Sequence, residues 1–272
     1  MIRTDTHLHS SFSSDSDTPI EDMVRRAIDL GLTTICFTEH FDMDFPDTPS
    51  HLDFQLDFDT YFDTLDMLKK SYDGRIEILS GVEFGIQPTL GDRPDGIFSK
   101  YADRIDFVIN SCHLVKGLDP FHALYFETYP GREGMRLYFE ETLANMKTFH
   151  NWNSAGHLDY ACRYMPEPVP EFSYRDYGDI LDAILEYIIK KDAALEINTA
   201  GLKYGLAWPN PHIDILKRYR ELGGRLITIG SDGHIPDHMA YDFDKVPGIL
   251  EEAGFREYVV YRKGVPCEIS LS

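Results

Sequence analysis

Short apolar runs rich in β-branched residues alternate along this sequence with longer stretches of helical periodicity. The apolar runs predict strands at Ile2–His7, Thr33–His40, Glu77–Gly85, Asp106–His113, Asn153–Asp159, Ala194–Ala200, Leu226–Asp232 and Glu257–Tyr261. Helices are expected near residues 19–30, 57–72, 95–103, 132–150, 174–191, 210–222 and 243–253. This alternation predicts repeated βα units and therefore a parallel sheet.

Two of the expected helices begin with local capping signals. Thr18 precedes Pro19 and Glu21, which predicts a threonine N-cap, proline at the first helical position and a capping box. Gly31 stands where that helix should end. Ser173, with an aspartate three residues later, predicts a similar start for the helix near 174–191.

The chain contains no Gly/Ser-rich linker and no short repeat that would divide it. The segment Phe41–Phe54 and the proline-rich stretch Pro166–Pro170 are interpreted as long loops. We therefore expect a single domain over residues 1–272, with seven or eight βα units closed into a barrel.

The composition is that of an ordinary folded protein, with 43% hydrophobic and 26% charged residues. A formal net charge of −20 repels nucleic acid and anionic lipid, so neither is expected as a partner. No apolar run is long enough for a membrane span, and a motif that begins at Asp5 leaves no room for a signal peptide. The four scattered cysteines lack a CxxC pair, which indicates a reduced, cytoplasmic protein.

Polar residues gather at the carboxyl ends of the predicted strands. Six of the eleven histidines lie there: His7, His9, His40, His113, His157 and His234. Glu39, Glu83, Asp159, Asn198 and Asp232 occupy similar places. Because these ends converge on one mouth in a parallel barrel, we expect the histidines and carboxylates to meet in an active site.

The segment Asp5–Asp15 carries the strongest single signal. His7 and His9 are two residues apart in a strand, so both imidazoles face the same side and can reach one metal. Asp5 is either an acceptor that orients an imidazole or a plain hydrogen-bond anchor in the barrel floor. Asp15 can return to the mouth through the following loop, and Asp17 competes with it for that place.

The next strand ends supply further ligand candidates. His40 is favoured over the adjacent Glu39, which alternation sends to the other face unless the chain has already left the strand. Glu83 is a carboxylate in an apolar strand, where it must be paired or bound to a cation. We interpret it as a bridge between two metals, with a buried ion pair as the alternative. His113 and His157 each end a strand.

The last strand ends in Ile-Gly-Ser-Asp-Gly-His, which places Asp232 and His234 together where glycines leave backbone room. Imidazole and carboxylate ligands without a thiolate suit Zn, Fe or Mn. Nine candidate ligands exceed the needs of one ion and predict two or three divalent metals. In such a cluster, a water or hydroxide between metals is expected to attack the substrate.

Together these motifs resemble the PHP superfamily, named for polymerase and histidinol phosphatase, over almost the whole chain. The motifs that carry the resemblance are Asp5–Asp15, Thr38–His40, Gly81–Glu83, Ser111–His113, Gly156–Asp159 and Gly230–His234. Within the superfamily the chain is most similar to monofunctional histidinol-phosphate phosphatases, through segments such as Ser-Cys-His-Leu-Val-Lys-Gly and Leu-Glu-Ile-Asn-Thr-Ala-Gly. The resemblance implies a distorted (β/α)7 TIM-like barrel of the α/β class.

The resemblance also implies a trinuclear metal centre and the residues that hold it. The implied ligand sets are His7, His9, Glu83 and Asp232 for one metal, Glu83, His113 and His157 for the second, and Asp15, His40 and His234 for the third. Glu83, Asp232 and His234 carry the catalytic role. Arg163 matches an arginine that the family uses on the substrate phosphate, which suits a planar guanidinium. Its alternative is a surface salt bridge, and Arg132 is a weaker second candidate.

The implied activity is hydrolysis of L-histidinol phosphate to L-histidinol and phosphate in histidine biosynthesis. Two alternatives stay open: a phosphatase for another small ester or nucleotide, and an exonuclease-type module that processes nucleic acid. A metal-stabilised binding module without catalysis is disfavoured. The oligomeric state is not predicted. His150 and His212 are expected on helices away from the mouth, and therefore outside the site.

Overall fold

The computed structural model describes residues 2–46, 52–166 and 172–271. In these ranges seven parallel strands form one sheet in which every strand pairs with its neighbour in sequence. The strands are β1 (Thr4–Leu8), β2 (Thr34–Asp42), β3 (Glu77–Gly85), β4 (Phe107–Ser111), β5 (Ser154–Ala155), β6 (Ala194–Asn198) and β7 (Ile227–Gly230). The expected distorted (β/α)7 barrel is confirmed.

The sheet nearly closes on itself, because β1 returns to the side of β7. The amide of Asp232 donates to the carbonyl of His7 at 2.9 Å, and the amide of His9 donates to Gly233 at 3.0 Å. The hydroxyl of Thr6 adds a bond of 2.9 Å to the carbonyl of Ile229. We call this junction of β1 with β7 and residues 231–233 the seam. It lies at the carboxyl ends of the strands, which form the mouth of the barrel.

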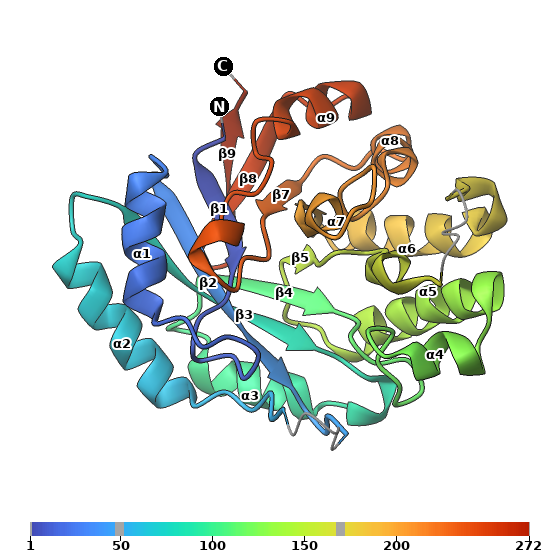
Figure 1. The fold of residues 1–272 in the computed structure, drawn as a ribbon, viewed down its shortest axis with the longest axis horizontal. Helices are drawn as coiled ribbons and strands as arrows, with labels where there is room; N and C mark the ends of the chain where they lie inside the picture. The colour runs from blue at the N-terminus through green and yellow to red at the C-terminus, as the bar shows by residue number, and fades with distance from the viewer. Residues whose placement is uncertain (1, 47–51, 167–171, 272) are drawn as a thin grey trace.

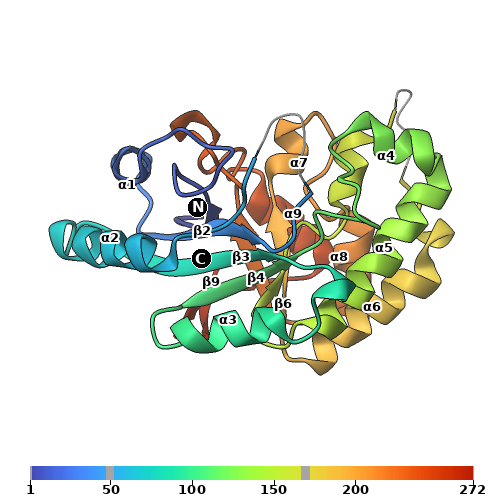
Figure 2. The same cartoon turned by 90° about the horizontal axis from the view of Figure 1, so that it is seen from below.

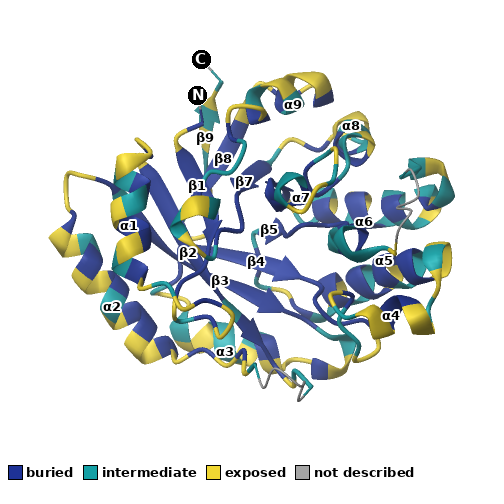
Figure 3. Cartoon of the chain, viewed as in Figure 1, coloured by how far each residue is buried: buried dark blue, intermediate teal, exposed yellow. Residues whose placement is uncertain are grey.

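Helices surround the strands (Figure 1), and Figure 2 shows the same arrangement from below. They are α1 (Ile20–Asp29), α2 (Phe58–Ser71), α3 (Arg93–Tyr101), α4 (Ala123–Thr128), α5 (Gly131–Thr148), α6 (Gly178–Lys190), α7 (Ala200–Lys203), α8 (Ile213–Glu221) and α9 (Val246–Ala253). Helix α1 buries Ile20, Met23, Val24 and Ala27, the spacing of one apolar face. In Figure 3 the seven barrel strands are mostly buried and the helices expose their outer sides.

An antiparallel hairpin of β8 (Glu257–Arg262) and β9 (Val265–Ser270) follows the barrel. Its turn covers the floor, the end of the barrel where the strands begin. There the amides of Lys263 and Gly264 donate to the carboxylate and the carbonyl of Asp106, at 3.2 and 2.9 Å. The predicted strand Glu257–Tyr261 therefore exists, but it belongs to this hairpin and adds no eighth unit to the barrel.

Both predicted helix caps are wrong. Helix α1 begins at Ile20 with Pro19, which has no polar side chain, at the N-cap position. Thr18 lies one residue too early, and its hydroxyl donates to the carbonyl of His234 at 3.1 Å. The segment after Ser173 forms only a short 3-10 turn, and α6 begins at Gly178. Gly31 has a φ of +75°, which confirms the predicted end of α1.

Some predicted boundaries also shift. Strand β2 continues to Asp42, so the loop predicted at Phe41–Phe54 begins two residues too early, and its residues 47–51 lie outside the described ranges. The Pro166–Pro170 loop lies almost wholly outside them. Strand β5 has only two residues, and the short helices α4 and α7 were not predicted. Across the described ranges, we find no helix with the length and apolar character needed to cross a membrane.

Candidate metal centre

The mouth of the barrel holds a cavity of about 420 Å³. Six of the nine predicted metal ligands line it: Asp15, His40, His113, His157, Asp232 and His234. The other three, His7, His9 and Glu83, are fully buried beneath them. His7, His40 and Glu83 lie near the ends of β1, β2 and β3, and the other six lie in the segments that follow β1, β4, β5 and β7. The parallel barrel therefore brings together residues that lie up to 227 positions apart between His7 and His234.

Glu83 stands at the centre of this group and is fully buried. Its Oε2 atom faces the ring nitrogens of His7, His9 and His40 at 3.2, 3.5 and 3.0 Å. Its Oε1 atom faces His113 and His157 at 3.3 and 2.9 Å. Five described imidazoles thus surround the two oxygens of one carboxylate, an arrangement suited to a bridging ligand.

Several buried atoms in this group lack a hydrogen-bond partner among the described residues. They are Nε2 of His7, His9 and His234, Nδ1 of His40 and His157, and Oε2 of Glu83. Unpaired buried polar atoms are rare in folded proteins, and a cluster of them needs an explanation. These are lone-pair donors gathered in sets whose atoms lie within 4.8 Å of one another, for example in His7, His9 and Glu83. The residues therefore fit divalent metals.

Two carboxylates outside the predicted set orient the ligand imidazoles. Glu196 Oε1 lies 2.6 Å from Nδ1 of His7, and Asp42 Oδ2 lies 2.6 Å from Nδ1 of His113. A proton held at each Nδ1 leaves each Nε2 as a lone-pair donor that points toward Glu83. The carboxylate–histidine pairing typical of metal sites is thus built into β6 and β2.

Glu39 acts on the site through a serine. Its Oε2 accepts the hydroxyl of Ser13 at 2.6 Å, and the same hydroxyl oxygen lies 3.2 Å from Nδ1 of His9. Because Ser13 donates to Glu39, its oxygen accepts from His9, which leaves Nε2 of His9 for a metal. Glu39 itself points away from the other ligands, as strand alternation with His40 predicts.

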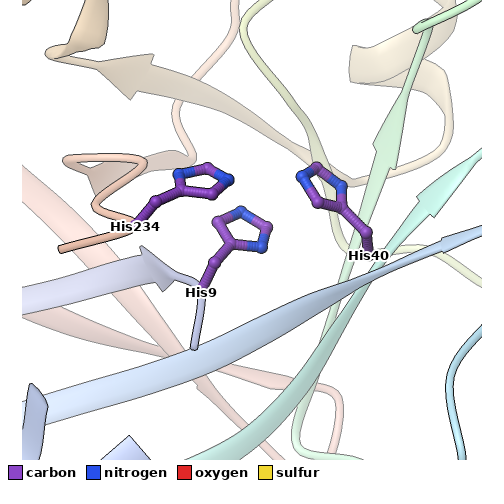
Figure 4. Close-up of side chains that lie close together, drawn as sticks. All are labelled: His9, His40 and His234. Atoms are coloured by element: carbon purple, nitrogen blue, oxygen red, sulfur yellow. The ribbon is translucent and has the colours of Figure 1, made fainter. Parts of the chain in front are cut away.

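A third group forms on the open side of the mouth, where His9, His40 and His234 lie close together (Figure 4). The Asp15 carboxylate approaches Nε2 of His40 and of His234 at 3.5 and 3.2 Å. His234 holds its Nδ1 near the carbonyl of Asp232 at 3.1 Å, which again leaves Nε2 for a ligand. Asp17, the competing carboxylate, does not line the cavity.

The electrostatics of the centre favour positive charge within it. Burial alone would raise the pKa of Glu83, but the charges of His7 and His40 lower that pKa well below its usual range. Burial likewise opposes charge on His7, yet Glu196 and Glu83 raise its pKa well above its usual value. Burial and the neighbouring His40 lower the pKa of His9. The centre therefore attracts cations, either protons or metal ions that replace them.

Two glycines make the close approach possible. A Cβ on Gly230 would lie 2.2 Å from Cβ of His7, and one on Gly85 would overlap the Asp42 carboxylate. Asp232 follows with a φ of 54°, a left-handed conformation that turns its side chain back toward the mouth. The glycines that flank the predicted ligands thus provide the space that the sequence suggested.

Arg163 lies beside this group, in the 3-10 helix Tyr160–Tyr164 after β5. Its side chain is 3% exposed and lines the cavity. Its Nη1 donates to Asp232 Oδ2 at 3.1 Å, so the surface salt bridge considered as its alternative is excluded. Arg132, by contrast, pairs with Asp176 on the surface of α5 and is wrong as a candidate.

Of the two roles considered for Asp5, the structure supports the hydrogen-bond anchor: Asp5 accepts the amide and hydroxyl of Ser231 at 2.9 and 2.6 Å and orients no imidazole. The predicted positions of His150 and His212 within helices need correction. His150 lies beyond the end of α5 on the floor, where it pairs with Asp95. His212 precedes α8 as its N-cap, and its amide donates to Asp159. Neither histidine is within a helix.

Sequence reasoning missed Glu196, Asp42 and Lys203. Glu196 stands two residues before Asn198 in an apolar strand, so the same cost of burial that identified Glu83 could have found it. Asp42 alternates with His40 once β2 is known to continue. Lys203 lines the cavity from α7 and donates to the carbonyl of Asp232 at 3.2 Å, but no strand pattern marks it.

The sequence is similar to that of several known proteins. The sequence profile of the PHP domain matches residues 5–200. The chain is 33% identical to a probable histidinol-phosphatase of Clostridium acetobutylicum, over 93% of this chain and 94% of that protein. It is 32% identical to a histidinol-phosphatase of Lactococcus lactis, over 96% and 95%.

A solved structure is similar over almost the same length. The histidinol phosphate phosphatase of Lactococcus lactis, crystallised with zinc, L-histidinol and phosphate, superposes with a TM-score of 0.87 at 31% identity. The match covers 97% of this chain and 98% of the other. A Listeria monocytogenes structure at 22% identity and a TM-score of 0.76 shares the fold.

Proposed function

The chain belongs to the PHP domain family, and we propose on that basis that it is a metal-dependent phosphomonoesterase that hydrolyses L-histidinol phosphate. One observation carries the proposal: unpaired buried imidazole and carboxylate atoms share a cavity with a fixed guanidinium. A cation cluster next to an arginine suits a phosphate ester, because both bind its anionic oxygens. The zinc, L-histidinol and phosphate bound to the Lactococcus lactis relative support the choice of alcohol.

We propose the same three sets of metal ligands that the resemblance to the PHP superfamily implies. His7, His9, Glu83 and Asp232 would hold one metal, and Glu83, His113 and His157 the second. The third would take Asp15, His40 and His234. When bound, two or three divalent metals such as Zn, Fe or Mn would supply a water of lowered pKa and positive charge for the phosphoryl oxygens.

The chain's own residues would divide the remaining work. Asp232 presents Oδ1 to His7 and His9, at 3.9 and 3.6 Å, and Oδ2 to Arg163. It therefore connects the metal ligands to the phosphate-binding side. Arg163, with Lys203 nearby, would bind the phosphate and keep its charge compensated as the alcohol leaves. His234 would hold its Nε2 toward the open side of the cavity.

Two other substrates remain alternatives. The metals and Arg163 are indifferent to the alcohol, so another small phosphate ester or a nucleotide is the first. Nucleic acid is the second, and the net charge of −20 counts against it. We also propose that residues 1–272 act as one unit, and the free cysteines Cys36, Cys112, Cys162 and Cys267 support a reducing, cytoplasmic setting.

A kinetic screen over phosphate monoesters and diesters tests the proposal. We expect the highest kcat/KM with L-histidinol phosphate, lower values with aryl phosphates and nucleotides, and little turnover of diesters. Failure to hydrolyse any monoester with metals loaded would refute the phosphatase. Preference for an oligonucleotide would instead favour the nucleic-acid alternative.

A further inference from the structure

The guanidinium of Arg163 is held from several sides. Within the described residues it donates three hydrogen bonds: Nε to Asn210 Oδ1 at 2.7 Å, Nη1 to Asp232 Oδ2 at 3.1 Å and Nη2 to Asn198 Oδ1 at 3.0 Å. A guanidinium has five N–H groups, so these bonds leave two for further partners. The rings of Tyr160 and Tyr204 lie 5.2 Å from its carbon.

Asn210 is itself fixed by a second carboxylate. It is fully buried, and its Nδ2 donates to Asp159 Oδ1 at 2.5 Å. Asp159 is also fully buried and accepts the amide of His212 at 2.9 Å. Because the amide nitrogen of Asn210 faces an acceptor, its oxygen must face Arg163. Asp159 thus sets the direction of the Asn210 side chain.

The backbone supports the same arrangement. Asn198 and Asn210 exchange two hydrogen bonds, at 2.7 and 2.8 Å, which ties residue 210 to the end of β6. Gly201 permits this approach, since a Cβ there would lie 2.9 Å from Asn210 Oδ1. Both amides on Arg163 therefore come from one bridge between two chain segments.

The choice of an amide on Nε has an electrostatic consequence. Asp232 already offsets part of the charge of Arg163, and a second carboxylate in direct contact would offset more of it. Asn210 transmits the fixed direction from Asp159 without bringing its negative charge onto the guanidinium. The guanidinium keeps both its orientation and its attraction for an anion.

We propose that Asp159 and Asn210 are positioning residues that fix the plane of Arg163 for phosphate. This rests on the proposed function, because it assumes that Arg163 binds the substrate phosphate. Neither residue lies among the proposed metal ligands. If this is correct, a change at Asn210 alters phosphate affinity only when Arg163 is present. A residue that contributed to stability alone would show no such dependence on Arg163.

The test is a double-mutant cycle on the protein as purified with its metals. Asn210→Ala, Arg163→Met and the double variant are compared by the inhibition constant of inorganic phosphate, by kcat and KM for L-histidinol phosphate, and by metal content. We expect Asn210→Ala to weaken phosphate inhibition about tenfold, on the order of one lost hydrogen bond to a charged group. In the Arg163→Met background the same change should alter phosphate inhibition less than twofold. Metal content should stay unchanged.

Asp159→Asn and Asn151→Ala complete the experiment. Asp159→Asn leaves the Asn210 side chain present but removes one acceptor at its far end, so we expect about a threefold weaker phosphate inhibition. Asn151 donates to Asp95 at 2.6 Å on the floor, and Asn151→Ala is the matched control, expected to leave phosphate inhibition unchanged. If Asn210→Ala does not fold, Asp159→Asn in both Arg163 backgrounds provides the same cycle.

The outcomes separate this inference from the proposed function. Equal losses from Asn210→Ala with and without Arg163 would overturn the positioning role, as would unchanged phosphate inhibition in a folded Asn210 or Asp159 variant. If the wild type hydrolyses no monoester, the proposed function fails first. In that case, calorimetric titration of the same variants with inorganic phosphate measures phosphate affinity directly. It then shows whether the effect of Asn210→Ala on that affinity depends on Arg163.

Discussion

At the floor of the barrel the charged side chains form ion pairs and hydrogen bonds with one another. At the mouth, several buried nitrogen and oxygen atoms of the charged and imidazole side chains have no hydrogen-bond partner among the described residues. On the floor, Arg262 donates twice to Glu77 at 2.6 Å, and Lys69 reaches Ser80 and Asp106 at 2.7 and 3.4 Å. At the mouth, five described imidazoles surround Glu83, and its Oε2 atom has no hydrogen-bond partner in the described ranges.

The difference shows where the fold is complete by itself and where it needs a ligand. A buried polar atom without a partner carries a desolvation penalty of about 1–3 kcal/mol, so a cluster of them is stable only if another species satisfies it. The floor satisfies its own charges and therefore contributes to stability. The mouth concentrates lone pairs and therefore binds cations.

Removing metal should produce the largest effect. We expect the purified protein to carry more than one equivalent of divalent transition metal, and chelation to abolish phosphatase activity. The thermal midpoint should also fall, because metals that bind the folded chain stabilise it. Elemental analysis, activity and thermal denaturation on one preparation check this. Full activity with only trace metal would contradict the conclusion that the mouth of the barrel, unlike the floor, needs a bound metal.

Glu83→Gln should come next. The substitution keeps the shape of the side chain but removes the charge that faces both groups of imidazoles. We expect turnover to fall by at least about two decades, and His234→Asn to have an effect of similar size. The control is His150→Ala on the floor, expected to stay within about twofold of wild type because His150 lies on the surface beside Asp95. A comparable loss in the control would show that the site is misplaced.

Arg163→Met should weaken turnover by roughly tenfold to several hundredfold while metal content stays intact, since a charge-assisted contact to phosphate contributes about 1.5–3 kcal/mol. Arg163→Lys should recover only part of this, because an ammonium lacks the planar fork. Inorganic phosphate should inhibit both variants less than wild type. Phosphate inhibition that is the same in all three proteins would exclude the assigned role.

Glu77→Gln on the floor should have the smallest effect, and on stability alone. Its partner Arg262 lowers the pKa of Glu77 from an ordinary 4.5, so the pair stabilises the folded chain above that pH. Both side chains are more than a third exposed, and we expect the free energy of unfolding to fall by about 0.5 kcal/mol at pH 7. The difference from wild type should shrink as the pH falls below 4.5. Urea titrations at several pH values measure it, and a changed kcat would contradict the division between the two ends.

Much of the fold could be predicted from the sequence because the longer barrel strands carry apolar runs and the long helices carry apolar faces. A strand at Asn153–Asp159 was predicted, but the structure shortens it to the two residues of β5, and the helices α4 and α7 were not predicted. Such short elements depend on tertiary packing. The caps failed for a similar reason. Thr18 has the side chain of an N-cap, but a carbonyl more than 200 residues away accepts its hydroxyl.

The candidate site divides in the same way. His7, His9 and Glu83 follow from strand alternation, which is a local property, and their convergence follows from the topology of a parallel barrel. Asn210 lies in the segment between α7 and α8, and nothing in its neighbours along the chain points to Arg163. Contacts of this kind form only when two segments that are distant in sequence pack together. They therefore cannot be predicted from the local pattern of a single sequence.

The seam has a consequence for how the protein is made. It joins the first barrel strand to the last, through bonds such as Thr6 to Ile229 and Ser231 to Asp5 that span more than 220 residues. During synthesis, β1 emerges from the ribosome long before the segment that completes its side of the mouth. His7 and His9 therefore cannot reach their final environment until residues 227–234 have been synthesised. Contacts between segments so far apart in sequence form slowly relative to local folding. The metal centre therefore needs residues from both ends of the barrel sequence, and a chain that stops before His234 lacks one of its nine proposed ligands.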